Sequence, residues 1–375
     1  MKPKLLIVGS FPTGNSKIYG GIATTCKTLV SSSFKESFKL VLIDSTQRSN
    51  PPPRIFVRSL FAFRRFLRFS LSLFWHRPDA VLLFAADGAS ILEKGTMAWL
   101  AKTLMIPVFL FPRAAGLIDS VSASRPRRVC VKIAMRGATH ILCQGASWQR
   151  FATNVLDFHV SKSPIIFNWS ATNELLDIGG SRTEYIPGHR PQLLFLGWLE
   201  KEKGIFELLH ALLILSKRYC FILTIAGRGH AEMEARDFVK DNNMEGVVKF
   251  VGWVEGAEKN ALMSKADILV LPSWAEGFPN VIIEAMASKI AVIVSRVGTV
   301  PDIVVDKQQA LLVAPKSIED LMLAFTTLLD SPAVLRSIAS NGYDFARNNF
   351  SVEMGAKKMT LVIQRAIEEV KSKKS

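Results

Sequence analysis

The sequence predicts an α/β protein with two doubly wound domains, in which helices cover both faces of a parallel sheet. Short, continuous apolar runs alternate with helical segments along all 375 residues, which is typical of buried parallel strands connected by helices. A stretch rich in Gly, Pro and polar residues at 169–190 separates these elements into two groups and is interpreted as a linker. A ligand site is expected in the cleft at the carboxyl ends of the strands.

The first domain is expected at residues 1–168, where each apolar run is short enough for a strand and is bounded by turn residues. The expected strands are 4–9, 39–44, 80–84, 107–111, 139–143 and 164–168, and the expected helices are 21–32, 55–74, 89–104, 127–136 and 147–156.

The second domain is expected at residues 191–350, with a long helix at 351–375 after it. The expected strands are 192–197, 221–226, 247–251, 268–271 and 291–295, and the expected helices are 205–217, 231–242, 258–264, 281–288, 318–329, 333–348 and one that starts at 352.

Composition excludes several classes of protein. Apolar residues make up 49% of the chain and charged residues 21%, so a disordered or fibrous protein is excluded. No uncharged run approaches the roughly 20 residues of a membrane-spanning helix, and the first apolar run is too short for a signal peptide, so we expect a cytoplasmic protein. The four cysteines form no C-x-x-C pair, the six histidines have no metal-ligand spacing and no Asp-x-Asp occurs, so no metal site or cofactor is expected.

The net charge of +15 lies entirely in the first half of the chain. Residues 1–190 hold 25 Lys/Arg and 10 Asp/Glu, whereas residues 191–375 hold 22 of each. Such an asymmetry concerns binding partners rather than the fold.

Much of this charge lies in the segment 54–77, where a predicted helix has a basic side and an apolar side. A basic amphipathic helix rich in Phe and Trp is typical of an element that binds an anionic membrane surface. An ordinary helix with its aromatic side in the core is the alternative. Nucleic acid is a third possible partner, but no recognition motif accompanies the charge, so none is predicted. On a helical wheel the arginines are Arg54, Arg58, Arg65 and Arg68, and the apolar residues roughly opposite are Phe56, Leu60, Phe63 and Leu67.

The most informative motif follows the predicted strand 268–271. A tight Glu-Gly-Phe-Pro loop begins at Glu276, and Asn280 is placed to cap a helix that starts at Val281. The amides at a helix start suit a diphosphate, and a carboxylate accepts two hydrogen bonds from vicinal hydroxyls. Glu276 and Glu284 therefore point to a nucleotide-sugar site, although two glutamates at this spacing are also common as a solvated or capping pair.

In this context the chain resembles the nucleotide-sugar-dependent glycosyltransferases of family 4, which have the GT-B fold of two Rossmann-like domains facing a cleft. The resemblance covers nearly the whole chain. It rests on Phe195-Leu-Gly-Trp-Leu-Glu-Lys-Glu-Lys203-Gly204, Ala226-Gly-Arg-Gly229, Val251-Gly-Trp253, Ala266-Asp-Ile-Leu-Val-Leu-Pro-Ser273, the Glu276–Glu284 block and Val297-Gly-Thr-Val-Pro-Asp-Ile303.

The resemblance implies a role for each matched residue. Glu276 would contact the donor sugar, Glu284 would hold the ribose, and Lys203 would neutralise the diphosphate. Trp253 and Val254 lie where the family contacts the base, largely through backbone atoms. The sequence therefore does not distinguish a UDP-sugar from a GDP-sugar. The final helix would cross back onto the first domain, as in relatives. The diphosphate would also meet the amides around Gly277, Phe278, Pro279, Asn280 and Val281, and the glycine-rich loop of the acceptor domain would correspond to Gly20 and Gly21.

The chain also departs from the family pattern. Trp198 stands where an arginine usually binds phosphate, and Arg228 is the candidate to replace it. Arg113 lies where the family often has a histidine; a guanidinium cannot act as a general base, but it can bind an anionic acceptor or a phosphate. These losses leave open a degenerate member that binds sugar nucleotides without catalysis.

The resemblance implies a metal-independent hexosyltransferase that moves a sugar from a UDP- or GDP-sugar, with retention of configuration. Together with the basic helix it implies a glycan acceptor linked to a lipid, in the assembly of bacterial surface polysaccharide or lipopolysaccharide. The expected location is the inner face of the cytoplasmic membrane, as a peripheral protein. Sugar-nucleotide epimerases share the two-domain fold but lack this glutamate motif.

Overall fold

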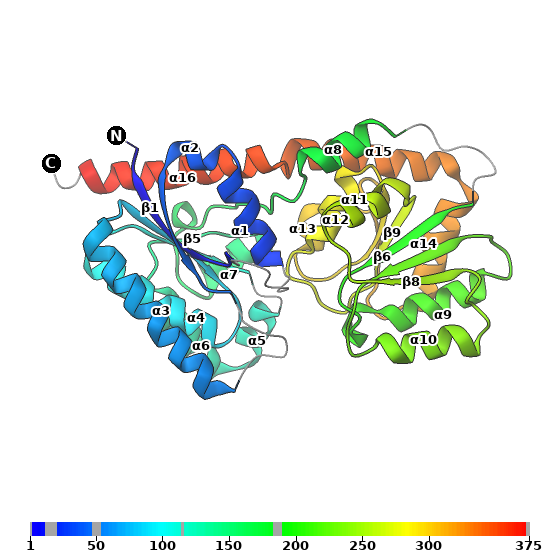
Figure 1. Cartoon of the computed structure of the whole chain (residues 1–375), viewed down its shortest axis with the longest axis horizontal. Coiled ribbons are helices and arrows are strands. Elements are labelled where there is room, and N and C mark those ends of the chain that lie inside the picture. The colour runs from blue at the N-terminus through cyan, green and yellow to red at the C-terminus, as the bar shows by residue number, and fades with distance from the viewer. Residues whose placement is uncertain (1, 12–20, 47–53, 114–115, 183–189, 373–375) are drawn as a thin grey trace. The chain divides into compact units, whose positions relative to one another are not determined.

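The structure is a computed structural model that describes residues 2–11, 21–46, 54–113, 116–182 and 190–372. The chain forms two compact units (Figure 1). Unit 1 comprises Met1–Trp169 and Val352–Ser375, and unit 2 comprises Ser170–Ser351. Within the described residues, no single helix has the length and hydropathy to cross a membrane; one pair of helices meets both criteria together, by length and composition only, and is bent by 103°.

Unit 1 contains a parallel sheet of five strands in the order β2-β1-β3-β4-β5. β1 lies between β2 and β3, so that Leu6 pairs with Val41 on one side and with Val81 on the other. All residues of β3 are buried, as expected for a strand covered on both faces. The strands are β1 (Lys4–Gly9), β2 (Lys39–Asp44), β3 (Ala80–Ala85), β4 (Val108–Pro112) and β5 (His140–Ile141).

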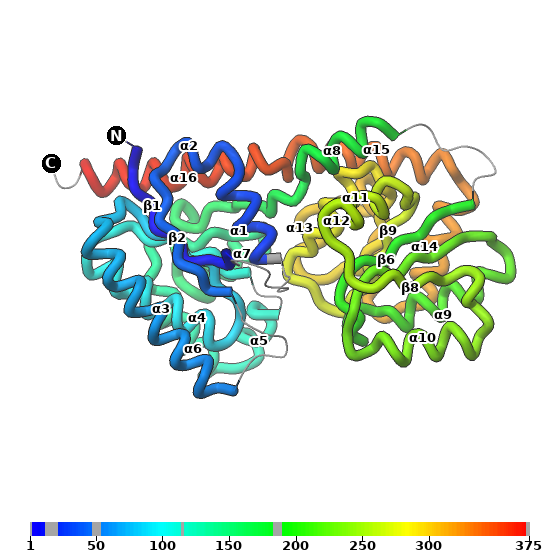
Figure 2. The backbone as a smooth tube through the Cα atoms, viewed as in Figure 1, coloured from blue at the N-terminus to red at the C-terminus, as the bar shows by residue number. Residues whose placement is uncertain are grey.

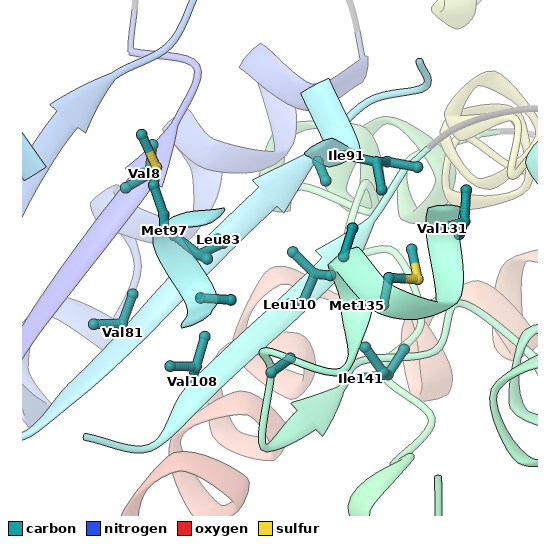
Figure 3. Packing of buried hydrophobic residues seen from close by; sticks show 14 of the residues in the cluster. Val8, Val81, Leu83, Ile91, Met97, Val108, Leu110, Val131, Met135 and Ile141 are labelled. Atoms are coloured by element: carbon teal, nitrogen blue, oxygen red, sulfur yellow. The ribbon is translucent and has the colours of Figure 1, made fainter. Parts of the chain in front are cut away.

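Each face of this sheet carries its own apolar core, because alternate residues of a strand point to opposite faces. Leu6 and Val8 belong to one core (Figure 3), whereas Leu5 and Ile7 belong to the other. The first core is covered by α3 (Ile55–His76), α4 (Ala89–Thr103), α5 (Leu117–Ala123), α6 (Arg125–Met135) and α7 (Ala146–Asn154), and the second by α1 (Gly21–Ser31), α2 (Phe34–Ser37) and α16 (Val352–Ser372).

The last helix of the chain, α16, belongs to unit 1, and its backbone runs beside α2 (Figure 2). Met359 and Ile363 are fully buried in the core that also contains Leu29 of α1 and Phe34 of α2. Gly355 permits a close approach, since a Cβ there would lie 2.7 Å from the Cβ of Trp169. The second core of unit 1 therefore depends on the carboxyl end of the sequence.

Unit 2 contains a parallel sheet of six strands in the order β11-β10-β9-β6-β7-β8. The chain runs outward from β6 to β8, then returns to β9 on the other side of β6 and runs outward again to β11. β6 and β9 are therefore the neighbours at which the strand order reverses, and ligands of open α/β sheets bind at such points. The strands are β6 (Gln192–Leu196), β7 (Ile222–Ala226), β8 (Val248–Gly252), β9 (Ile268–Leu271), β10 (Ala291–Ser295) and β11 (Leu311–Val313).

The helices of unit 2 connect these strands and cover the sheet. The short 3-10 turn η2 follows β6 and directly precedes α9, so that it lies in the loop at the carboxyl end of β6. These elements are α8 (Asn173–Gly180), η2 (Lys201–Lys203), α9 (Ile205–Leu215), α10 (Glu232–Asp241), α11 (Gly256–Lys265), α12 (Asn280–Ala287), α13 (Val300–Ile303), α14 (Ile318–Asp330) and α15 (Pro332–Asn349).

One expected strand is absent, and a helix that was not expected lies in the segment predicted as a linker. The segment 164–168 is not a strand, since it makes only an isolated bridge between Ile165 and Cys143. The apolar character of this segment reflects burial instead, because Ile166 and the neighbouring Trp169 pack in the second core. The expected linker 169–190 contains α8, which is capped by the Thr172 side chain. The elements α2, α5, α13 and β11, each seven residues or shorter, are also not among those expected.

Candidate functional site

Both glutamates of the predicted pair lie in unit 2, one on each side of the start of α12. Glu276 belongs to the loop between β9 and α12, and Glu284 lies inside α12. The two side chains are only 10% and 8% exposed, but each accepts a hydrogen bond from a lysine rather than packing in an apolar core. The pair thus brings two buried, paired charges to one end of the sheet of unit 2.

The first charge pair joins the two loops at the point where the strand order reverses. Lys203, in the loop after β6, donates from Nζ to Oε1 of Glu276 at 2.6 Å. The hydroxyl of Ser273, in the loop after β9, donates to the same oxygen at 2.8 Å. Glu276 is therefore held by a cation and a hydroxyl, with its second carboxylate oxygen oriented by these contacts. Lys203 and Glu276, predicted separately, form one group.

Glycine at position 204 explains how the two loops come so close. Its φ is +73°, and a Cβ at this position would lie 2.1 Å from the carbonyl oxygen of Pro272. Any other residue would push the loop after β6 away from the loop after β9. The loops are also bonded directly, since the amide of Trp274 donates to the carbonyl of Glu202 at 2.8 Å.

A second glycine fixes the backbone at Glu276 from the other side. Gly298, in the loop after β10, has a φ of +56°, and a Cβ there would lie 1.7 Å from the carbonyl oxygen of Glu276. The next residue, Thr299, donates from its amide and from its hydroxyl to the carbonyl of Gly277. Three loops, after β6, β9 and β10, therefore position one carboxylate.

The second charge pair involves a residue that the sequence did not single out. Lys259 of α11 donates from Nζ to Oε1 of Glu284 at 2.8 Å. Its side chain is 21% exposed, so one end of this pair is open to solvent. Lys259 and Ser273 were missed because a contact between residues distant in sequence leaves no spacing signal; only their place beside the glutamate motif could have suggested them.

The start of α12 differs from the expectation. The helix begins at Asn280 rather than Val281, so Pro279 occupies the cap position and makes no side-chain cap bond. Pro279 has no amide hydrogen, which leaves the amides from Asn280 onward at the positive end of the helix. Gly277 lies in the loop before the helix, Phe278 stacks edge-on against Phe350 at 6.1 Å between ring centroids, and Val281 lies in the first turn.

The residue in place of the usual phosphate-binding arginine makes an aromatic pair instead. The rings of Trp198, after β6, and Trp253, after β8, lie 4.6 Å apart between centroids. Arg228 lies after β7, the strand between them, and its side chain is exposed; its Nε is 3.9 Å from where a Cβ on Gly252 would lie. Val254, next to Trp253, is half-buried. Two indoles and one guanidinium therefore gather at the carboxyl ends of three adjacent strands.

In unit 1 the predicted residue that the structure places most clearly is Arg113. It follows β4 and donates to the side chains of Thr25, at 2.9 Å, and Asn168, and its guanidinium lies 5.0 Å from the ring centroid of Phe111. Burial lowers the pKa of Arg113 to about 10, so it remains a cation at neutral pH. Within the described part of the chain no carboxylate pairs with it.

The remaining predictions for unit 1 concern its loops and α3. Gly21 is the first residue of α1, whereas Gly20 lies outside the described residues. Arg54, Arg58 and Arg68 are exposed. Arg65 was expected on the lipid-facing side, but its guanidinium donates twice to Glu93 of α4, at 2.6 and 2.9 Å, so this arginine holds two helices together.

Metal ligands are not grouped in the part of the chain that the structure covers. Across the described ranges, no cluster of three or more His, Cys, Asp or Glu side chains could hold a metal ion. The cations that lie close to Glu276 and Glu284 are the ammonium groups of lysines.

Comparison with known proteins identifies the family that part of this chain resembles. Residues 181–345 match the family described as glycosyl transferases group 1. The chain is 34% identical to the glycogen synthase of Mycobacterium tuberculosis over an alignment of 143 residues. This alignment covers 38% of this chain and 34% of the glycogen synthase. The curated relatives are matched over between 34% and 62% of their own length.

Solved structures resemble the chain over nearly its whole length. Sucrose-phosphate synthase from Thermosynechococcus elongatus has a TM-score of 0.77 at 18% identity, with 98% of this chain and 100% of that chain covered. Anabaena Alr3699/HepE, solved in complex with UDP and glucose, has a TM-score of 0.70 at 17% identity, with 96% and 99% covered. These likenesses confirm the expected GT-B fold. Residues 181–345 therefore resemble the glycosyl transferases of group 1, within a chain that has the GT-B fold.

Proposed function

We propose that this glycosyltransferase moves a sugar from a UDP- or GDP-sugar to a glycan acceptor, with retention of configuration. The observation that carries the proposal is the Lys203–Glu276 pair, held by Ser273 where β6 and β9 meet, beside the start of α12. The point at which strand order reverses is where open α/β sheets bind nucleotides. A lysine, a carboxylate and helix amides there match the phosphates and hydroxyls of a nucleotide sugar.

The chemistry assigned to each group follows from its charge. An acceptor hydroxyl attacks the anomeric carbon on the face from which the nucleoside diphosphate departs, and its proton passes to the leaving phosphate oxygen. Lys203 stabilises the charge that develops on this oxygen, and the amides of α12 add their partial charge. Glu276 accepts hydrogen bonds from the donor sugar and orients Lys203. Because the lysine supplies the countercharge, the proposed step does not require a divalent cation.

Recognition of the nucleoside is assigned to the other groups of unit 2. Glu284 accepts hydrogen bonds from the ribose hydroxyls, and its bond to Lys259 orients the carboxylate. Trp198 and Trp253 offer aromatic surface to the base, and Arg228 supplies a second cation for the phosphates. HepE was solved with UDP and glucose, which supports a uridine nucleotide as the first donor to test.

Unit 1 carries the assignment of the acceptor. Arg113 is a fixed cation at the carboxyl end of β4, and no carboxylate of the described residues satisfies it. We propose that it binds a phosphate of an anionic, lipid-linked glycan in bacterial surface polysaccharide or lipopolysaccharide assembly. The proposed place of action is the inner face of the cytoplasmic membrane.

The donor assignment predicts a selective thermal shift. A UDP-sugar or GDP-sugar at about 100 times its dissociation constant should raise Tm by several degrees, because binding only the folded state stabilises it by about 2.7 kcal/mol. Uridine monophosphate should shift Tm less, because it lacks the second phosphate. The absence of any shift across UDP- and GDP-sugars would remove the proposal.

The same sample distinguishes an active enzyme from the alternative, a degenerate member that binds sugar nucleotides without catalysis. This alternative is favoured by Trp198, which pairs with Trp253 where the family usually has a phosphate-binding arginine. The enzyme should hydrolyse the bound donor slowly without acceptor, releasing free sugar and nucleoside diphosphate. Protection against unfolding without any hydrolysis or transfer would support the binding-only alternative.

Arg113→Gln should raise KM for a diphosphate-linked acceptor roughly tenfold to a hundredfold and leave KM for a neutral glycan unchanged, because one charge-assisted contact is lost. Arg113→Lys should restore part of the affinity. Arg150→Gln serves as the control, since Arg150 is an exposed residue of α7. Equal effects of Arg113→Gln on both acceptors would show that Arg113 is structural.

A further inference from the structure

The structure shows which side of α3 is buried, and it is not the side that carries Phe56, Phe63 and Leu67. Phe69 and Leu73 are buried in the first core of unit 1, and Phe66 packs against it. The apolar residues on the opposite side recur every three or four positions and are 46% to 87% exposed: Phe56, Leu60, Phe63, Leu67, Leu71 and Phe74. The explanation of α3 as an ordinary helix with its aromatic side in the core is therefore wrong.

This stripe of six apolar residues (the α3 stripe) is not required to hold the helix in place. α3 is anchored from its inner side by Phe69 and Leu73 and by the two bonds from Arg65 to Glu93. Lys94, which is 1% exposed, lies within 3.2 Å of Glu93 and completes this ion cluster. An exposed apolar patch of this kind marks a binding surface, because a soluble protein rarely keeps a contiguous one without a partner.

The charges around the stripe indicate the partner. Residues 54–77 contain six arginines and no Asp or Glu. Arg58 is exposed on the side roughly opposite the stripe, whereas Arg64 and Arg68 are exposed and lie along one flank of the stripe, between it and the buried side. Arginine side chains in this position can lie along the apolar surface and place their guanidinium groups at the level of lipid phosphates.

The neighbouring helices extend the same surface. α3, α4 and α6 lie side by side in the helical layer of unit 1 (Figure 1). Trp99 of α4 and Val129 and Ile133 of α6 are 41% to 57% exposed. Trp75 at the end of α3 is 80% exposed, and an indole is the side chain most often found at a membrane boundary.

We propose that the α3 stripe and the adjoining faces of α4 and α6 dock on an anionic lipid membrane, with α3 lying in the plane of the surface along its length of about 33 Å. A second copy of the chain fits less well, because it would bring the exposed arginines of residues 54–77 against their own copies, and this segment contains no Asp or Glu. The lipid-linked acceptor rests on the proposed function, whereas the docking surface rests on unit 1 alone.

The test is co-sedimentation of the full chain, without sugar nucleotide, with vesicles of phosphatidylcholine alone or with about 30% phosphatidylglycerol. Strong, salt-sensitive binding to the anionic vesicles is expected. Replacing Arg64 and Arg68 with Gln should weaken binding roughly thirtyfold, at about 1 kcal/mol for each arginine and a factor of ten for each 1.4 kcal/mol. Arg65 is retained because it holds Glu93.

Replacing Phe56, Phe63 and Leu67 with Ser should weaken binding at least tenfold, also at high salt, because these residues supply apolar burial rather than charge. Met233→Ser with Leu323→Ser is the matched control: both residues are exposed and apolar but belong to unit 2. The fluorescence of Trp75 should shift to shorter wavelength with anionic vesicles, and the shift should decrease in Trp75→Phe.

Failure of the parent protein to sediment with anionic vesicles would overturn the inference, and so would unchanged binding by both the arginine variant and the apolar variant. A vesicle-free dimer that the serine variant dissociates would identify a second copy as the partner and would equally overturn it. Lys203→Met should bind vesicles as the parent does, so loss of transfer and loss of docking are separate results.

Discussion

Lys203→Met should lower kcat about a thousandfold while leaving the protein folded. Removing one preorganised group that stabilises charge in a transition state typically costs a factor of about 10² to 10³, and here a full cation is lost. Lys203 is 26% exposed, so its head faces the solvent-accessible side of the site and can reach a phosphate that displaces part of its bond to Glu276. Steady-state transfer from the donor that gives the largest thermal shift is the measurement.

The matched control is Lys201→Met. Lys201 belongs to the same short turn, but its ammonium bonds to Glu234 of α10 and its side chain is 57% exposed. This variant should transfer sugar at the parental rate. If both lysine variants were equally impaired, the effect would come from the turn as a whole; near-normal transfer by Lys203→Met would remove Lys203 from the mechanism.

Much of this site could be predicted because its parts lie close together in sequence. The strand β9, the Glu-Gly-Phe-Pro loop and α12 follow one another, so Glu276 and Glu284 fall beside a helix start whatever the remainder of the chain does. Lys203 comes from another strand, and only the order of the sheet, with β6 next to β9, brings it to Glu276. Lys203 was predicted from the family resemblance, and the order of the strands explains why its side chain reaches Glu276.

The remainder of the site depends on tertiary contacts without a local signal. Lys259 is one of several lysines on helices, and nothing in its local sequence distinguishes it until the fold brings its ammonium group to Glu284 of α12. In the sequence Gly298 looks like an ordinary turn residue. Only the structure shows that the carbonyl of Glu276 occupies the space that a Cβ at this position would need. Contacts of this kind become visible only when the loops are placed in space.

The same limit explains what was expected of α3. A helical wheel divides residues 54–77 into a basic side and an apolar side, but periodicity alone does not say which side faces the core. The helix has a second apolar row, Phe66, Phe69 and Leu73, and this row packs on the sheet. Arg65 looks equivalent to Arg58 and Arg68 on the wheel, but its position along the helix brings it to Glu93 of α4.

Glu284→Ala should raise the apparent dissociation constant of the donor several hundredfold, because a buried carboxylate that accepts two ribose hydroxyls contributes two charge-assisted hydrogen bonds. The variant also leaves Lys259 without its partner, so stability should fall by about 1–3 kcal/mol, as when one member of a partly buried pair is removed. Donor titration and thermal unfolding measure the two effects separately.

Lys259→Met distinguishes ribose binding from a purely structural role of the same pair. It breaks the pair but keeps the carboxylate, so it should cost similar stability while donor affinity falls much less. A donor that lacks a ribose hydroxyl sharpens the distinction. The parent and Lys259→Met should both bind the intact donor much more tightly than this analogue, whereas Glu284→Ala should bind the two equally. This is the result that a double-mutant cycle gives for two groups in direct contact. If Glu284→Ala kept the preference for the intact ribose, the carboxylate would act only through α11 and α12, and the nucleoside would have to be held elsewhere in the unit.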